Sequence, residues 1–181
     1  MESTEYYINL LNKIKDRSLK IAVVGLGYVG LPTAVAFHRA GYHVTGIDSS
    51  QEVIEGLKSG KSPIIKEIGV ELPLVQNWKL TTNYEEAIPN SDVTLVCVPT
   101  PVDKNLQPNL KSVNSAMQSI INSMDNDGTM VIILESTVQP GTTELTVNEA
   151  KSKRTNFKGK VMVAYCPERV SPGEGGYGVS D

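Results

Sequence analysis

The 181 residues of the chain are 40% hydrophobic and 20% charged, an ordinary composition for a globular domain long enough to bury a full core. A formal net charge of -3, without a cluster of lysines or arginines, gives no indication of nucleic acid or of an anionic membrane surface as a partner. The longest apolar runs, such as VTLVCVP and MVIIL, are too short to span a bilayer, and the N-terminus lacks the layout of a signal peptide.

Helical spacing of Tyr7, Leu10, Leu11 and Ile14 predicts an amphipathic helix over residues 4–15. Beyond it, short apolar strands alternate with helices. Strands are predicted at Lys20–Val24, His43–Ile47, Lys79–Thr81, Val93–Val98, Met130–Leu134 and Val161–Tyr165. Helices are predicted at Val29–Ala40, Gln51–Ser59, Asn83–Ala87, Leu110–Met124 and Thr142–Lys151. The stretch 61–77, the proline-rich loop after the fourth strand and the Gly/Pro-rich tail from residue 166 are predicted to be irregular.

This alternation is typical of βαβ units, which pack as a parallel sheet with helices on both faces. Six strands are the number found in the doubly wound dinucleotide fold, so the predicted class is an α/β, three-layer Rossmann sheet. We expect an N-terminal helix in residues 1–18 and one Rossmann domain in residues 19–181.

The segment GLGYVG, residues 25–30, follows an apolar strand and opens a helix, the context that a dinucleotide-binding turn requires. Gly25 can take the dihedral angles of a tight turn, and Gly27 leaves room for a pyrophosphate against the backbone. Gly30 allows the helix and the strand to pack closely. The alternative is a turn that only serves packing.

Asp48 stands at the end of the second predicted strand, about 20 residues after the turn. A carboxylate there can accept hydrogen bonds from both adenosine ribose hydroxyls and would repel a 2′-phosphate. No arginine follows it, because the next residues are Ser49, Ser50 and Gln51. The position favours NAD over NADP, and Asp48 can also be a helix-capping residue.

Four stretches of the chain together resemble the UDP-glucose/GDP-mannose dehydrogenase family: VGLGYVGLPTAVAFHRAGYHVTGIDSS, VCVPTPVD, ESTVQPGTTE and YCPERVSPGEG. The resemblance implies an NAD-dependent oxidation of the C6 alcohol of a nucleotide sugar to a carboxylate, with two NAD and a cysteine thioester. The last stretch is similar to the N-acetylhexosamine branch, whose substrates are UDP-N-acetylglucosamine and UDP-N-acetylmannosamine. Pro172 occupies the position of a second family glutamate, which puts that acid's role in doubt.

The resemblance also implies roles for individual residues. The residues expected to bind the cofactor are Gly25, Gly27, Tyr28, Val29, Gly30, Asp48, Pro99, Thr100, Ser136 and Thr137. Thr137, near the nicotinamide, and Glu168, as an acid that activates water, are the expected catalytic residues. Thr100 can instead be a turn residue with local hydrogen bonds, and Glu168 can instead form a surface ion pair with Arg169 or a lysine.

The family's nucleophilic cysteine belongs to a later Gly-rich stretch that these 181 residues do not contain. Cys97 is predicted to be an inert core residue, and Cys166 a variant residue of the cofactor domain. Neither indicates a disulfide scaffold, which favours a reducing cytoplasm. His38 and His43 are too few to hold a metal ion.

We therefore expect a cofactor domain without the family's central and C-terminal domains, inactive by itself, with a UDP-sugar as the full-length protein's substrate. The family implies a homodimer through a later region, and a monomer stays open for these 181 residues. A β-hydroxyacid dehydrogenase-like domain and a non-catalytic dinucleotide-sensing module are the alternative functions.

Overall fold

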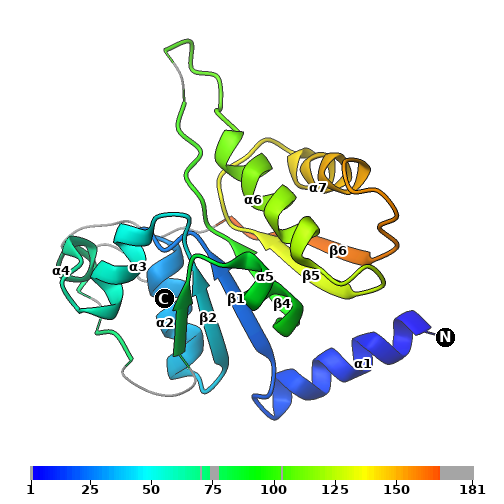
Figure 1. The fold of residues 1–181 in the computed structure, drawn as a ribbon, viewed down its shortest axis with the longest axis horizontal. Coiled ribbons are helices and arrows are strands. Elements are labelled where there is room, and N and C mark those ends of the chain that lie inside the picture. Colours follow the sequence, from blue (N-terminus) through cyan, green and yellow to red (C-terminus); the bar gives the residue numbers. More distant parts are fainter. Residues whose placement is uncertain (1, 70, 74–77, 103, 168–181) are drawn as a thin grey trace.

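The computed structural model describes residues 2–69, 71–73, 78–102 and 104–167, which form one six-stranded sheet with helices on both faces (Figure 1). The strands are β1 (Lys20–Val24), β2 (His43–Ile47), β3 (Trp78–Thr81), β4 (Val93–Val96), β5 (Thr129–Leu134) and β6 (Lys160–Tyr165). The helices are α1 (Glu2–Lys15), α2 (Gly30–Arg39), α3 (Gln51–Lys58), α4 (Pro63–Ile68), α5 (Tyr84–Ala87), α6 (Lys111–Ser123) and α7 (Thr142–Ser152), with the 3-10 turn η1 (Ile88–Asn90) after α5.

All strand pairs are parallel, and the order across the sheet is β3-β2-β1-β4-β5-β6. This is the doubly wound order, in which the chain first builds one half of the sheet outward from β1 and then returns to build the other. The six strands and the Rossmann class predicted from the sequence are confirmed.

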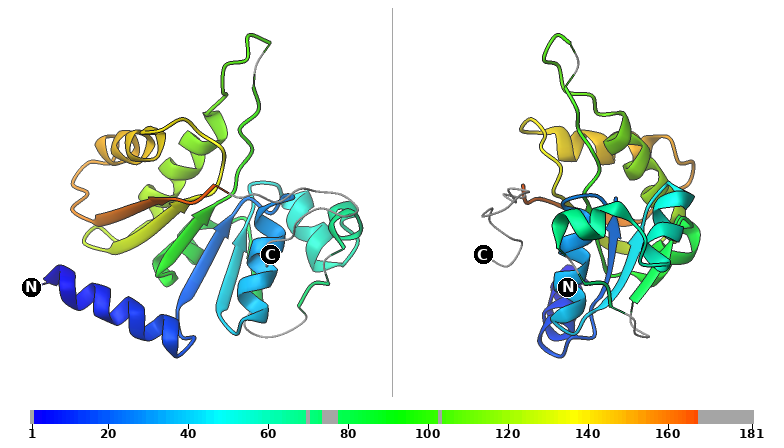
Figure 2. Two further views of the ribbon diagram at one scale, coloured as in Figure 1. Left: turned by 180° about the vertical axis from the view of Figure 1, so that it is seen from behind. Right: turned by 90° about the vertical axis from the view of Figure 1, so that its left-hand side faces the viewer.

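Two apolar cores lie on the two faces of the sheet, because successive side chains of a strand point to opposite faces. In β1, Ile21 and Val23 pack in the core that includes α2 and α3, and Ala22 and Val24 pack in the core beneath α5, α6 and α7. The helices that follow β1 and β4 therefore cover opposite faces, as the views in Figure 2 show.

Helix α1 lies across the lower end of the sheet in Figure 1, away from the C-terminal ends of the strands. Leu10 is buried in the core shared with α2, and the Tyr6 hydroxyl donates to the Thr129 carbonyl at 3.3 Å. Lys13 and Asp92 form an ion pair at 2.6 Å. The predicted N-terminal helix is thus docked on the Rossmann sheet.

One helix lies in a stretch that the sequence predicted to be irregular. Helix α4 begins with Pro63, whose missing N–H costs nothing in a first helical turn, and ends at Gly69, with a left-handed φ of 63°. The fourth strand was predicted to reach Val98, yet its ladder with β5 ends at the pair Val96–Leu134. In the part of the chain that the structure describes, no helix has the length and apolar character needed to cross a bilayer.

Candidate functional site

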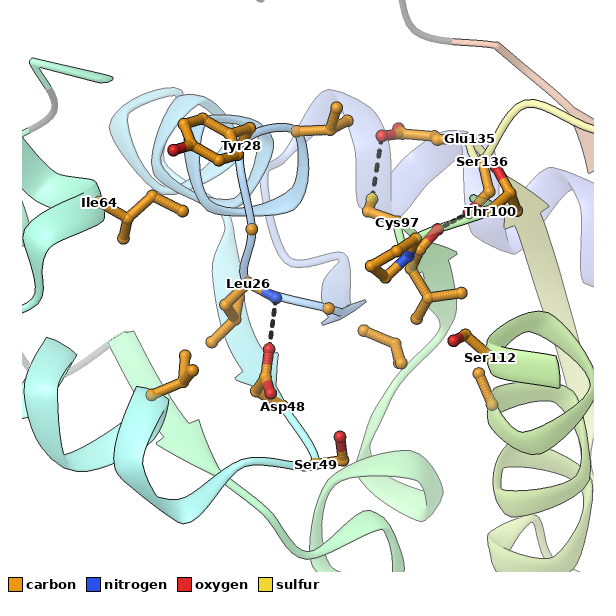
Figure 3. A pocket seen from close by; sticks show the side chains of 18 of the residues that line it. Leu26, Tyr28, Asp48, Ser49, Ile64, Cys97, Thr100, Ser112, Glu135 and Ser136 are labelled. Carbon is orange, nitrogen blue, oxygen red and sulfur yellow. Dashed lines mark hydrogen bonds between the residues drawn. The ribbon is translucent and has the colours of Figure 1, made fainter. Parts of the chain in front are cut away.

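A cleft of about 990 Å³ opens at the C-terminal ends of β1, β2, β4 and β5 (Figure 3). Strands β1 and β4 are neighbours there, and the helices that follow them depart to opposite faces of the sheet. Such a switch point is where open α/β sheets bind their ligands, and the volume lies within the ~300–1,000 Å³ usual for small-molecule sites.

Most of the predicted cofactor-binding residues meet in this cleft. Its lining includes Gly25, Gly27, Tyr28, Val29, Asp48, Pro99, Thr100, Ser136 and Thr137. Gly30 is absent from the lining and lies behind the turn. Glu168, the predicted catalytic acid, lies outside the described residues.

The three glycines of the turn have different surroundings. Gly25 has a φ of +90°, and a Cβ there would lie 2.8 Å from the Cys97 carbonyl oxygen. At Gly30 a Cβ would lie 1.8 Å from the Gly25 carbonyl oxygen, so only glycine lets α2 start so close to β1. At Gly27 a Cβ would have no neighbour within 4 Å. Gly27 is therefore not required by packing, and its open side faces the cleft.

Asp48 joins the end of β2 to the glycine turn. Its Oδ2 accepts from the Leu26 N–H at 2.9 Å (Figure 3). Its Oδ1 accepts from the Ser50 N–H, also at 2.9 Å. These bonds fix the carboxylate beside the turn. An ionised carboxylate has about four acceptor positions, so it can hold both backbone donors and still accept from a ligand hydroxyl.

Helix α4 and Tyr84 add walls to the cleft on the side of Asp48, and the sequence did not indicate either. The Tyr28 hydroxyl donates to the Glu67 carboxylate, which links the glycine turn to α4 and raises the pKa of Tyr28. Burial, with the nearby charge of Asp48, raises the pKa of Tyr84 to about 12. These contacts are visible only in the three-dimensional structure, which brings α4 next to the glycine turn.

The other half of the cleft carries hydroxyl groups after β4 and β5. The Ser136 hydroxyl donates to the Val98 carbonyl at 2.7 Å and so holds the loop after β4 in place. Thr100 is half-buried and Thr137 is exposed, and among the described residues neither side chain makes a hydrogen bond. The local hydrogen bonds considered for Thr100 are thus not found in the described part of the chain.

A buried thiol–carboxylate pair also forms the wall of this half. The Cys97 thiol donates to Oε2 of Glu135 at 3.1 Å, and both residues are 8% exposed. Cys97 is buried as predicted, but it borders the cleft and bonds to an acid instead of lying inertly within a strand. Glu135 is a polar residue directly after an apolar strand, and this was the available signal for it in the sequence.

The cleft fits a dinucleotide. Gly27 leaves space against the backbone for a pyrophosphate, and Asp48 offers an acceptor on one side of it. Hydroxyl groups and Glu135 lie on the other side, beyond β4. Within the described ranges, no three His, Cys, Asp or Glu side chains gather in a way that could hold a metal ion.

Comparison with known proteins also indicates a dinucleotide-binding domain. The sequence model of the UDP-glucose/GDP-mannose dehydrogenase family, NAD binding domain, matches residues 19–179. A UDP-N-acetyl-D-mannosamine dehydrogenase of Methanococcus aeolicus is 43% identical over 172 residues, which cover 90% of this chain and 37% of that protein. A UDP-N-acetyl-D-glucosamine 6-dehydrogenase of Pseudomonas aeruginosa is 36% identical, over 91% of this chain and 38% of the relative.

A solved structure of a UDP-D-ManNAc dehydrogenase from Pyrococcus horikoshii superposes with a TM-score of 0.68 at 33% sequence identity. The match covers 86% of this chain and 37% of that one. The chain thus spans less than two fifths of the length of these relatives.

Proposed function

Since residues 19–179 match its NAD-binding domain, the chain belongs to the UDP-glucose/GDP-mannose dehydrogenase family, and we propose that it binds NAD in the cleft at the C-terminal end of its sheet. The pyrophosphate lies against Gly27, and the adenosine ribose hydroxyls donate to Asp48. The contact between Asp48 and the Leu26 N–H carries this proposal, because it holds an acceptor next to a turn with no side chain in the way.

The full-length protein is proposed to oxidise the C6 alcohol of a UDP-N-acetylhexosamine to the carboxylate. Relatives named UDP-N-acetyl-D-mannosamine dehydrogenase and UDP-N-acetyl-D-glucosamine 6-dehydrogenase support this substrate class. When bound, the nicotinamide supplies a hydride acceptor. Residues 1–18 serve as a helix docked on the domain of residues 19–181, and the nucleophile belongs to a later domain of the full-length protein.

Two residues of this chain are proposed to act near the reacting atoms. Thr137 follows β5 and presents an exposed hydroxyl on the cleft lining, where it can hold a water or the carboxamide. Glu168, three residues after β6, is proposed as the acid that positions or deprotonates the water in the hydrolytic step.

The cytoplasm is the proposed compartment, and a homodimer is the proposed assembly of the full-length protein. Neither the buried Cys97 nor the exposed Cys166 forms a disulfide, which is the state that a reducing compartment maintains.

Calorimetric titration of the purified chain with NAD+ and with NADP+ tests the cofactor assignment. We expect saturable binding of NAD+ with one site per chain and at least tenfold weaker binding of NADP+, because a 2′-phosphate would meet the Asp48 carboxylate. Equal affinities would contradict the proposed role of Asp48. Absence of binding to either dinucleotide would contradict the proposed function.

A further inference from the structure

We infer that a second groove, lined by Lys20, Lys58 and Lys79, binds a triphosphate group. This lysine groove has a volume of about 690 Å³, which lies within the ~300–1,000 Å³ usual for small-molecule sites. Among the described residues it shares no lining residue with the cofactor cleft. The inference therefore concerns a separate site and does not depend on the proposed function.

The register of the strands brings polar side chains to one face of the sheet. Ala22 of β1 packs in the core beneath α5, α6 and α7, so Lys20, two residues earlier, points to the same face. Across the sheet, Ala22 pairs with Thr45 of β2, and Thr45 pairs with Lys79 of β3. The polar residues that share this face and line the lysine groove are Lys20, His43, Thr45, Lys79 and Thr81.

This part of the face is not buried, although parallel sheets are usually covered by helices on both faces and their strands are then apolar. Helices α6 and α7 lie on the side of β5 and β6 (Figure 1). The helix that contacts β2 on this face is α5, which has four residues. Lys20, His43 and Lys79 are accordingly exposed to solvent, and Thr45 is half-buried. The groove is thus an open polar surface at the β3 end of the sheet.

Positive charge is concentrated in the lysine groove. Lys58, at the end of α3, joins Lys20 and Lys79 in its lining, and Glu86 on α5 is the carboxylate among the described lining residues. Three lysines against one glutamate leave an excess of two positive charges, whereas the whole chain has a net charge of -3. In the part of the chain that the structure describes, none of these lysines forms an ion pair.

A triphosphate group matches these lysines in charge and in size. A lysine ammonium is a compact charge with three donors and binds phosphate as a point charge, and the hydroxyl groups of Thr45 and Thr81 add further donors. Linked phosphates concentrate several negative charges and can meet more than one ammonium at once. NAD+ has opposite charges on its pyrophosphate and its nicotinamide ring, so its small net charge does not fit the lysine groove.

Titration of the chain with inorganic tripolyphosphate, with NAD+ present in excess to fill the cofactor cleft, tests this inference. Backbone amide chemical shifts give the dissociation constant at each site, and we expect saturable changes at His43, Thr45 and Lys79. The double variant Lys20→Gln/Lys79→Gln should bind about tenfold more weakly, because it loses two of the three cations. Glu86→Gln should bind about twofold to threefold more tightly, because it loses the opposing charge.

A matched variant separates the groove from general attraction to surface lysines. Lys153→Gln/Lys158→Gln removes the same charge from two exposed lysines outside the groove and should bind within about twofold of wild type. Circular dichroism checks that all variants are folded. Equal weakening by the two double variants, or no saturable change at the groove amides, would overturn the inference.

Two further probes define the ligand. ATP without Mg²⁺ carries the same triphosphate group: tighter binding than tripolyphosphate identifies a nucleotide as the source, and weaker binding identifies an inorganic chain. A tetraglutamate peptide that binds more tightly than either would overturn the assignment to phosphate. A chain that fails to bind NAD+ would refute the proposed function alone, since the groove amides still report on tripolyphosphate.

Discussion

Replacing Asp48 with alanine should damage both the glycine turn and NAD binding, and the two effects can be measured separately. The carboxylate accepts from the backbone N–H groups of Leu26 and Ser50, each at 2.9 Å. Leu26 is 1% exposed, so water does not readily replace the lost acceptor, whereas Ser50 lies nearer the surface. The variant therefore strands one buried donor and loses the proposed contact to the ribose.

A charge-assisted hydrogen bond with a buried donor contributes about 1.5–3 kcal/mol, so we expect a loss of about 2–3 kcal/mol in the free energy of unfolding. For a chain of this length that lowers the melting temperature by roughly 5–10 °C. Stranding the ribose hydroxyls should weaken NAD+ binding by about 1–3 kcal/mol, which is about 5- to 150-fold in the dissociation constant.

Urea unfolding gives the first quantity, and calorimetric titration well below the melting temperature gives the second. Asp48→Asn is the matched control, because its amide keeps one acceptor oxygen and the shape of the side chain. It should lie between wild type and Asp48→Ala in both measurements. A destabilised Asp48→Ala that binds NAD+ within twofold of wild type would refute the ribose contact and leave Asp48 a structural residue.

Four further expectations concern other parts of the chain. Gly27→Val should abolish dinucleotide binding without unfolding the domain, whereas Gly30→Val should unfold it, since a Cβ at Gly30 would lie 1.8 Å from the Gly25 carbonyl oxygen. Circular dichroism measures the folding of both variants, and titration with NAD+ measures their binding. Normal NAD+ binding by Gly27→Val would contradict the proposed site. Tyr84, with its pKa raised to about 12, should contribute about 1–2 kcal/mol of stability that is fully present below pH ~10 and lost as the pH rises through the folded-state pKa. The unfolding free energy of Tyr84→Phe should not fall with pH over this range, and a fall equal to that of the wild type would contradict the raised pKa. The purified chain should not reduce NAD+ with a UDP-N-acetylhexosamine, because it lacks the later cysteine, and steady growth of NADH absorbance would show another nucleophile at work. In a full-length protein, Glu168→Gln should slow turnover about 10²- to 10⁴-fold and accumulate a covalent adduct visible by intact mass spectrometry, with NAD+ affinity retained; normal turnover would make Glu168 structural.

The fold could be predicted because its signals are local. An apolar run of four to six residues followed by a helical pattern recurs along the chain, and this alternation is typical of a parallel sheet covered by helices. Helix α4 was not predicted because a segment of six residues is too short to show a helical period. Its boundary signals, Pro63 at the start and Gly69 at the end, were present but looked like the punctuation of a loop.

The two ends of the site differ in how far the sequence could reveal them. Asp48 and the glycine turn are related by a fixed spacing, because β1, α2 and β2 join them through one short unit. The bond between Tyr28 and Glu67 joins residues 39 positions apart, and that between Cys97 and Glu135 spans 38 positions. No spacing rule links such residues, since their contact depends on which helix covers which strand end.

Backbone amide chemical shifts during a titration with NAD+ test most directly whether this cleft holds the cofactor. We predict saturable changes at Leu26, Ser49 and Ser136, which line the cleft from the ends of three different strands. The separate groove lined by His43 and Lys79 should serve as the internal reference and show no saturable change. Changes confined to that groove, or no saturable change at any of the cleft amides, would contradict the assignment of NAD to this site.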